Sequence, residues 1–163
     1  MAVRIALTGH ALFSTLHTED TVSAVFRMIE MGVPPYLLAA TLSGVIAQRL
    51  VRRICPHCRE AYAVPASSRA QAQLGSLYHE GMTLTRGRGC AHCHGSGYRG
   101  RMAIHEILPV SERIRAAILE GHDKSSLRAA AVEDGMETLW QDGTAKVLAG
   151  ETTLAEVERA LYG

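Results

Sequence analysis

The sequence predicts a mixed α/β fold that carries a small cysteine-rich module and ends in a helical part. Three observations lead to this prediction. A short apolar run of strand-forming residues spans residues 10–17, helical periodicity covers residues 20–54 and everything after Pro109, and all four cysteines fall within residues 55–101. The chain has 163 residues, of which 47% are hydrophobic and 20% charged. That composition is typical of a globular protein with a buried core and excludes a disordered chain.

The chain shows no targeting or membrane-spanning segment. No run approaches 18 uninterrupted apolar residues, as a transmembrane helix would require. Residues 1–5 read MAVRI and do not begin the long apolar run of a secretory signal. We therefore expect a cytosolic protein.

Charge is unevenly distributed along the chain although its net value is only +1. Residues 1–48 carry a net −1. Residues 49–101 carry nine arginines against two glutamates, a net +7, and residues 102–163 carry six cations against eleven acids, a net −5. Two interpretations stay open: an ordinary solvated surface, or modules with different neighbours.

The apolar run at residues 10–17 predicts a buried, parallel strand. Its C-terminal end would present a group of polar side chains, namely Ser14, Thr15, His17 and Thr18. His17 at that position could be a catalytic base, although a lone histidine there is as often structural.

Two helices are predicted to follow. The first is capped by Asp20 or Thr21 and ends at Met31, before Gly32. The second begins at Pro34-Pro35 and covers residues 36–54. Its expected apolar stripe consists of Leu38, Leu42, Val45, Ile46, Leu50 and Ile54.

The end of the chain predicts one strand and four helices. Residues 101–108 alternate and predict a strand that closes the cysteine module. The helices are expected to run from Ser111 to Gly121, over 125–133, over 137–148, and from a Thr153–Glu156 capping box to about Leu161.

The four cysteines form two pairs, Cys55-Pro-His-Cys58 and Cys90-Ala-His-Cys93, with 31 residues between them. Two residues between cysteines allow both thiolates of a turn to bind one metal ion, and a second such turn completes a tetrahedral zinc site. One structural zinc per chain is therefore predicted. Redox-active pairs are the main alternative, but such cysteines commonly open a helix, and here both pairs lie in turn-like sequence.

Three histidines and several arginines lie near these cysteines. His57, His92 and His94 could compete as ligands, but with four thiolates available we expect them to be bystanders. The flanking arginines could neutralise the −2 charge of a four-thiolate zinc centre or bind nucleic acid. Few aromatic residues are available for stacking, so no specific nucleic acid is expected.

The sequence contains no complete catalytic site. There is no G-x-x-x-x-G-K-[ST], no apolar strand ending in acidic residues to hold magnesium, no G-x-S-x-G and no H-E-x-x-H.

An ordered set of motifs resembles the ATPases of type II secretion and type IV pilus assembly. The set comprises residues 8–18 (TGHALFSTLHT), 31–33 (MGV), 46–52 (IAQRLVR), both cysteine pairs, 97–101 (GYRGR), 104–108 (IHEIL) and 142–143 (DG). It covers nearly the whole chain in the family's order. A match of residues 90–97 to the DnaJ-type zinc repeat is weaker, because only the second cysteine pair fits. A stand-alone zinc-stabilised interaction module, DnaJ-like or nucleic-acid-binding, is the alternative.

The resemblance implies the C-terminal part of a RecA-like P-loop ATPase, hexameric and cytoplasmic, peripheral at the inner face of the bacterial inner membrane. It implies an inner-membrane platform protein and the secretion or pilus machinery as partners. The nucleotide-sensing His box would consist of Thr8, Gly9, His10, Ser14, Thr15, His17 and Thr18. His17 would lie near the γ-phosphate, and Cys55, Cys58, Cys90 and Cys93 would bind zinc.

Three parts are expected on this basis. Residues 1–54 would be the end of the ATPase core, residues 55–105 the zinc module, and residues 106–163 a C-terminal helical subdomain. The family's phosphate-binding and magnesium-binding segments would precede residue 1. ATP and Mg²⁺ are therefore expected only in the full-length protein, and residues 1–163 alone are not expected to hydrolyse ATP.

Overall fold

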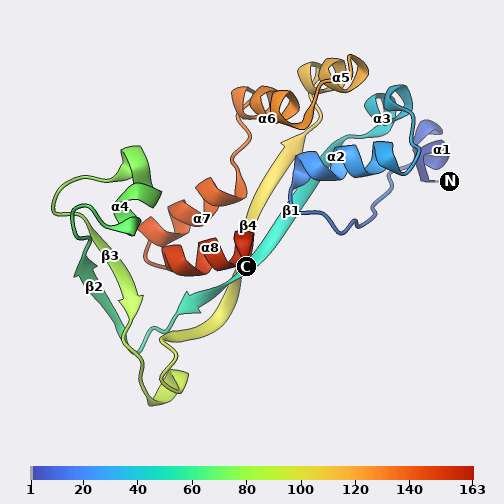
Figure 1. Ribbon diagram of the computed structural model, residues 1–163. Coiled ribbons are helices and arrows are strands. Elements are labelled where there is room, and N and C mark those ends of the chain that lie inside the picture. The colour runs from blue at the N-terminus through green and yellow to red at the C-terminus, as the bar shows by residue number, and fades with distance from the viewer. Residues whose placement is uncertain (1) are drawn as a thin grey trace. The chain divides into compact units, whose positions relative to one another are not determined.

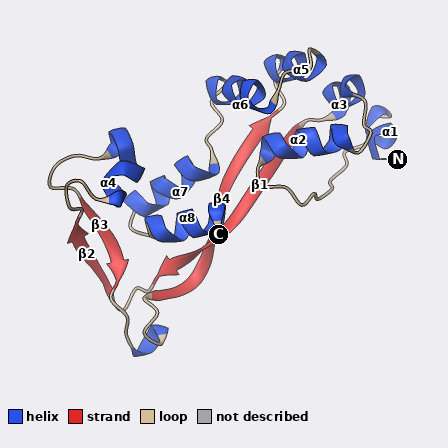
Figure 2. Cartoon of the chain, viewed as in Figure 1, coloured by secondary structure: helices blue, strands red, loops and turns tan. Residues whose placement is uncertain are grey.

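The computed structural model describes residues 2–163 as a mixed α/β chain (Figures 1 and 2). In chain order, the elements are α1 (Ala2–Leu7), α2 (Thr21–Glu30), α3 (Pro35–Thr41), β1 (Gly44–Ile54), β2 (Arg59–Ala63), α4 (Arg69–Leu74), η1 (Gly75–Leu77), β3 (Thr83–Gly87), η2 (Ala91–Cys93), β4 (Tyr98–Pro109), α5 (Glu112–Leu119), α6 (Lys124–Glu133), α7 (Leu139–Leu148) and α8 (Leu154–Tyr162). Strand β1 pairs with β4, and β2 pairs with β3.

The chain forms two compact units, each built from two segments. Unit 1 consists of residues 1–48 and 106–138, and unit 2 of residues 49–105 and 139–163. The four C-terminal helices are therefore divided: α5 and α6 belong to unit 1, whereas α7 and α8 belong to the unit that holds the cysteines.

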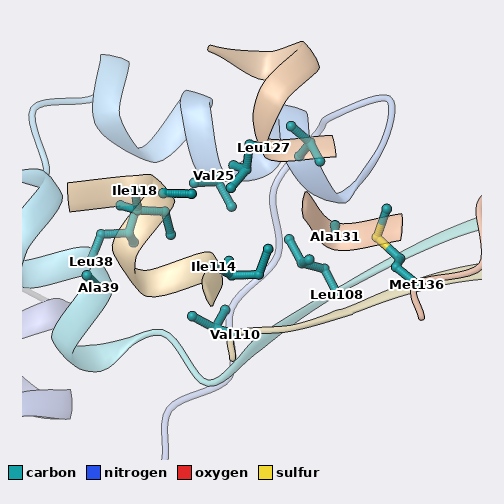
Figure 3. Close-up of a cluster of buried hydrophobic side chains, with 12 residues drawn as sticks. Val25, Leu38, Ala39, Leu108, Val110, Ile114, Ile118, Leu127, Ala131 and Met136 are labelled. Atoms are coloured by element: carbon teal, nitrogen blue, oxygen red, sulfur yellow. The ribbon is translucent and has the colours of Figure 1, made fainter. Parts of the chain in front are cut away.

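Unit 1 is built around an apolar core. Its side chains come from helices α2, α3, α5 and α6 and from the end of β4. Figure 3 shows Leu38, Ile114 and Ile118 among the side chains gathered in this cluster. Its buried members are Val22, Val25, Leu38, Ala39, Leu108, Val110, Ile114, Ala117, Ile118, Leu127, Ala131 and Met136. Burying such side chains stabilises a fold by about 1.5–3 kcal/mol for each large one.

Side-chain caps fix where three helices of unit 1, α2, α5 and α6, begin. The Asp20 carboxylate accepts a hydrogen bond of 2.7 Å from the Ser23 N–H at the start of α2. Ser111 accepts from Ile114 at the start of α5, and Asp123 caps α6 in the same way. Each cap satisfies a backbone N–H that has no partner within its helix. The helices predicted from Asp20 and from Ser111 are confirmed.

Unit 2 contains the antiparallel pair β2–β3, whose register runs from Arg59 opposite Gly87 to Ala63 opposite Thr83. Helices α7 and α8 pack closely in the same unit. A Cβ at Gly143 of α7 would lie 2.6 Å from Cγ1 of Val157 of α8, so this glycine allows the two helices to approach. The predicted strand over 101–108 is confirmed within β4, as are the helices predicted over 137–148 and from Thr153.

The strand predicted over residues 10–17 is wrong. These residues form neither helix nor strand, and every one of them is exposed. The side chain of Phe13 is 97% exposed. An apolar run forms a buried strand only when a neighbouring strand accepts its hydrogen bonds and a core covers its side chains, and residues 2–163 supply neither for this segment.

The helix predicted over residues 36–54 is also wrong beyond its first two turns. Helix α3 ends at Thr41, and residues 44–54 form strand β1. Side chains of a strand alternate between its faces: Ile46 and Leu50 are exposed, whereas Ala47 and Val51 are buried. The apolar spacing fitted a helical stripe as well, but the many β-branched residues favour the strand.

Within residues 2–163, every helix is too short or too polar to cross a bilayer.

Candidate metal centre

The four cysteines meet where the ends of four strands come together. Cys55 directly follows β1, Cys58 directly precedes β2, and Cys90 and Cys93 lie in the turn between β3 and β4. All four Sγ atoms lie within 4.8 Å of one another. Among the described residues, this is the one group of at least three histidine, cysteine or acidic side chains that could hold a metal ion.

The spacing of the sulfur atoms fits tetrahedral coordination. The Sγ–Sγ distances are 4.0 Å for Cys55 and Cys90, 3.8 Å for Cys58 and Cys93, and 3.7 Å for Cys90 and Cys93. Four sulfurs at about 2.3 Å from a common centre would be about 3.8 Å apart. Such distances also exceed the length of about 2.05 Å expected of a disulfide, and the four cysteines are free thiols.

Backbone N–H groups of the second cysteine turn donate hydrogen bonds to the sulfur atom of Cys93. The Cys93 Sγ accepts hydrogen bonds from the N–H of Cys90 (3.2 Å) and of Gly97 (3.3 Å). Gly97 has φ +77°, and a Cβ there would lie 2.4 Å from the carbonyl oxygen of Gly87. Only glycine permits this close approach of two backbones, which brings the end of β3 beside the second cysteine turn.

The surroundings of Cys58 and Cys93 shift the pKa values of their thiols in opposite directions. Burial raises the pKa of the Cys58 thiol to about 12, and hydrogen bonding to the neighbouring thiols contributes to the increase. Burial also opposes ionisation of Cys93, but hydrogen bonds from the N–H groups of Cys90 and Gly97 lower the pKa of that thiol to about 6. Since metal ligation requires thiolates, a bound cation would supply the charge that keeps the remaining sulfurs ionised.

The histidines of the two turns lie outside this cluster. The rings of His57 and His92 stack on each other with centroids 4.0 Å apart and an angle of 21° between their planes. Both are exposed, as is His94, which adopts φ +51°. None of the three belongs to the group of potential ligands.

Three arginines near the cysteines are engaged with acidic or carbonyl groups of unit 2. Arg52 pairs with Glu156 at 2.5 Å, Arg53 with Glu151 at 3.6 Å, and Arg59 donates to the Gly150 carbonyl. Arg99 and Arg101 are exposed and form no ion pair with the described residues.

The residues predicted to form a nucleotide-sensing site lie mostly at the surface of the described chain. Residues 9–17 are exposed, including His17. The contact within the set joins the Thr8 hydroxyl and His10 Nδ1 at 2.9 Å. The other predicted members are Gly9, Ser14, Thr15 and Thr18, of which Thr18 is partly buried and donates to the Asp20 carbonyl oxygen at 3.3 Å.

A buried carboxylate that binds the start of α2, just after this segment, was missed by the sequence interpretation. Glu106 of β4 is 2% exposed and accepts hydrogen bonds from the N–H (3.0 Å) and hydroxyl (2.5 Å) of Thr21. Arg128 of α6 lies 3.6 Å from Glu106 and 2.5 Å from Asp20. The signal was available: Glu106 lies between Ile104 and Leu108 on one face of the predicted strand, and an acid on a buried face requires partners.

Comparison with known proteins gives a consistent picture over nearly the full chain. Residues 1–159 match the family described as "Type II/IV secretion system protein". The chain is 47% identical over 161 residues to a putative type II secretion system protein E of Escherichia coli, covering 98% of this chain and 32% of that protein. It is 44% identical over 157 residues to the type IV pilus assembly ATPase PilB of Thermus thermophilus, covering 96% and 18%. It is 41% identical over 159 residues to the type II secretion system protein HxcR of Pseudomonas aeruginosa, covering 98% and 30%. The chain thus spans about a fifth to a third of the length of these relatives.

Proposed function

The chain belongs to the family of type II/IV secretion system proteins, and we propose that it is the C-terminal part of a hexameric cytoplasmic ATPase that powers type II secretion or type IV pilus assembly. The observation that carries this proposal is the match over residues 1–159 together with relatives at 41–47% identity that cover at least 96% of the chain. One of these relatives is named a pilus assembly ATPase.

We propose that Cys55, Cys58, Cys90 and Cys93 bind one structural zinc ion per chain. Sulfur spacing of 3.7–4.0 Å supports tetrahedral coordination, and four thiolates are a ligand set that zinc accepts in structural sites. An all-cysteine site leaves no open coordination position, which supports a structural role over a catalytic one.

We propose three parts with separate roles: residues 1–54 as the end of a RecA-like core, residues 55–105 as the zinc module, and residues 106–163 as a helical subdomain. Within the first part, the segment from Thr8 to Thr18 would face nucleotide, and His17 would lie near the γ-phosphate. The exposure of this segment leaves its polar groups accessible to a ligand. Residues 1–163 contain no phosphate-binding loop sequence, so by themselves they are proposed not to hydrolyse ATP.

A chimaeric motor tests these roles. The 157 matched residues of the Thermus thermophilus relative would be replaced by this chain, and ATP hydrolysis of the purified chimaera measured. We expect a rate within about tenfold of the parent. His17→Ala should lower it by at least tenfold, whereas His79→Ala, a change at an exposed histidine outside the segment, should leave it unchanged. A folded, metal-loaded chimaera without ATPase activity would contradict the proposal.

We further propose that the motor works at the inner face of the bacterial inner membrane, with a platform protein and the secretion or pilus machinery as partners and with no specific nucleic acid. Arg99 and Arg101 are exposed and unpaired among the described residues, which suits contact with an acidic protein surface. Charge reversal (Arg99→Glu with Arg101→Glu) should weaken binding of the chimaera to the platform protein. Reversal of Arg69, which pairs with Glu158 on another part of the unit, is the matched control. Equal binding by both variants would count against this face.

A further inference from the structure

The loop between α7 and α8 runs along the end of β1, directly before the first cysteine. The N–H of Ile54 donates to the carbonyl oxygen of Glu151 at 2.9 Å, and the Thr152 hydroxyl donates to the carbonyl oxygen of Arg52 at 2.8 Å. Thr152 is fully buried. The residue adjoining Cys55 is therefore hydrogen-bonded to the segment that leads into α8.

A buried carboxylate in the first turn of α8 also binds the end of β1. Glu156 is 2% exposed and accepts hydrogen bonds from the N–H of Arg52 (3.1 Å), from its guanidinium group (2.5 Å) and from Arg159 (3.0 Å). Burial opposes ionisation, but the hydrogen bonds from Arg52 and Arg159 lower the pKa of Glu156 to about 2. Because its pKa is depressed on folding, the stabilisation is present above the unfolded value of about 4.3 and is lost as the pH falls towards 2.

The second cysteine turn reaches the same helix end through Tyr98. The guanidinium carbon of Arg52 lies 4.3 Å from the centroid of the Tyr98 ring, and the Tyr98 hydroxyl lies 2.8 Å from the hydroxyl of Thr153. Thr153 is the N-cap of α8, and Tyr98 begins β4 five residues after Cys93. The flanks of both cysteine pairs thus converge on the start of one helix.

We propose that these four residues, Arg52, Tyr98, Thr153 and Glu156, form a clamp through which metal occupancy of the four-cysteine centre controls the order of α8. With metal bound, the ends of β1 and β4 are held where the clamp closes. Without it, the two cysteine turns lose the bonds that hold them together, Arg52 and Tyr98 are no longer fixed in place, and α8 loses its anchor. The inference rests on the metal centre proposed above.

Thermodynamic linkage makes the effect reciprocal. If metal binding stabilises the clamp by some factor, then weakening the clamp must lower metal affinity by the same factor. Glu156 is the residue at which this can be tested, because its carboxylate binds Arg52 and Arg159 and no hydrogen bond joins it to a cysteine. A residue that only stabilised α8 would not change the affinity of the cysteines for metal.

Hydrogen exchange and metal titration on the complete chain test the proposal. Native mass spectrometry first establishes whether one zinc is bound, and a chain without zinc would refute the metal centre itself. On chelation, amide exchange in residues 154–162 is expected to accelerate at least tenfold, whereas exchange in α5 and α6 stays within twofold. Unchanged exchange in α8 of a chain that had bound and then lost zinc would overturn the inference, as would equal acceleration in α5 and α6.

The reciprocal arm compares two glutamates of the same helix. Glu156→Gln should keep one zinc per chain but raise its dissociation constant about tenfold. Glu158→Gln, at a carboxylate that pairs with Arg69 of α4, should leave it within twofold. Tyr98→Phe removes one hydroxyl while keeping the ring over Arg52, and a smaller weakening of about threefold is expected. Equal zinc affinities for the two glutamine variants would overturn the clamp.

Discussion

Units 1 and 2 are stabilised by different means. Unit 1 encloses a cluster of twelve buried apolar residues and contains no cysteine. Unit 2 also buries apolar side chains, among them Leu84, Ile104 and Val147, but its strand ends converge on four cysteines and on the buried carboxylate of Glu156, which pairs with the half-exposed guanidinium of Arg52. A core of packed hydrocarbon needs no ligand, whereas a cluster of buried thiols gains its stability from metal binding. The two units should therefore respond differently to the same treatment.

Loss of metal ligation should have the largest effect and should be confined to unit 2. Cys58→Ser removes one thiolate, and structural zinc contributes about 10–16 kcal/mol to the folding of small zinc-dependent domains. We expect loss of the metal and rapid amide exchange across residues 55–101. Fluorescence of Trp140, the single tryptophan, which lies in α7 of unit 2, should report the change.

The adjacent His57→Ala is the matched control, because His57 stacks on His92 outside the group of potential ligands. It should leave metal content at one per chain. If His57→Ala released the metal, or if Cys58→Ser retained it, the assignment of ligands would be wrong. Slow exchange in α5 and α6 of both variants would sharpen the contrast between the units.

Truncation within the apolar core of unit 1 should give the converse result. Ile114 is fully buried between its neighbours in the core, so Ile114→Ala should lower the free energy of unfolding of unit 1 by about 2–5 kcal/mol, and Ile114→Val by about 0.5–1.5 kcal/mol. Urea unfolding followed by exchange in α5 and α6 measures this loss. Metal content and Trp140 fluorescence of the folded protein should not change; a loss of metal from Ile114→Ala would contradict the independence of the two units.

The sequence correctly predicted those parts of the fold that depend on interactions between residues close to one another in the chain. Asp20 and Ser111 begin helices because their side chains accept hydrogen bonds from backbone groups three residues away. The two cysteine turns were likewise predicted from spacing, because each turn is defined by four consecutive residues and two such turns together supply the four ligands of one metal ion. The Thr153–Glu156 signature predicted the start of α8, and Thr153 does accept from the Glu156 N–H.

The remaining parts of the fold depend on residues that are far apart in the sequence. The carboxylate of Glu156 binds Arg52 and Arg159 instead of returning to its own N-cap, because an arginine 104 positions earlier lies beside it. Residues 44–54 form a strand because β4 offers a pairing edge, which apolar spacing alone could not reveal. Residues 10–17 lack such an edge within the described chain, and the same kind of apolar run remains exposed.

A single hydroxyl in unit 1 gives the smallest and most specific test of the comparison. Thr21 is fully buried, and its hydroxyl and N–H both donate to Glu106. Thr21→Val keeps the shape but leaves the buried carboxylate with one donor fewer, so the free energy of unfolding of unit 1 should fall by about 1–3 kcal/mol. Thr21→Ser retains the hydroxyl and should recover most of that difference, measured by the same urea unfolding. If the serine variant were destabilised and the valine variant were as stable as the original protein, packing of the methyl group and not the hydrogen bond would account for the stability at this position. A destabilised valine variant with a stable serine variant would instead show that unit 1, like unit 2, depends on one well-partnered buried carboxylate, and that the contrast between the units lies in the metal.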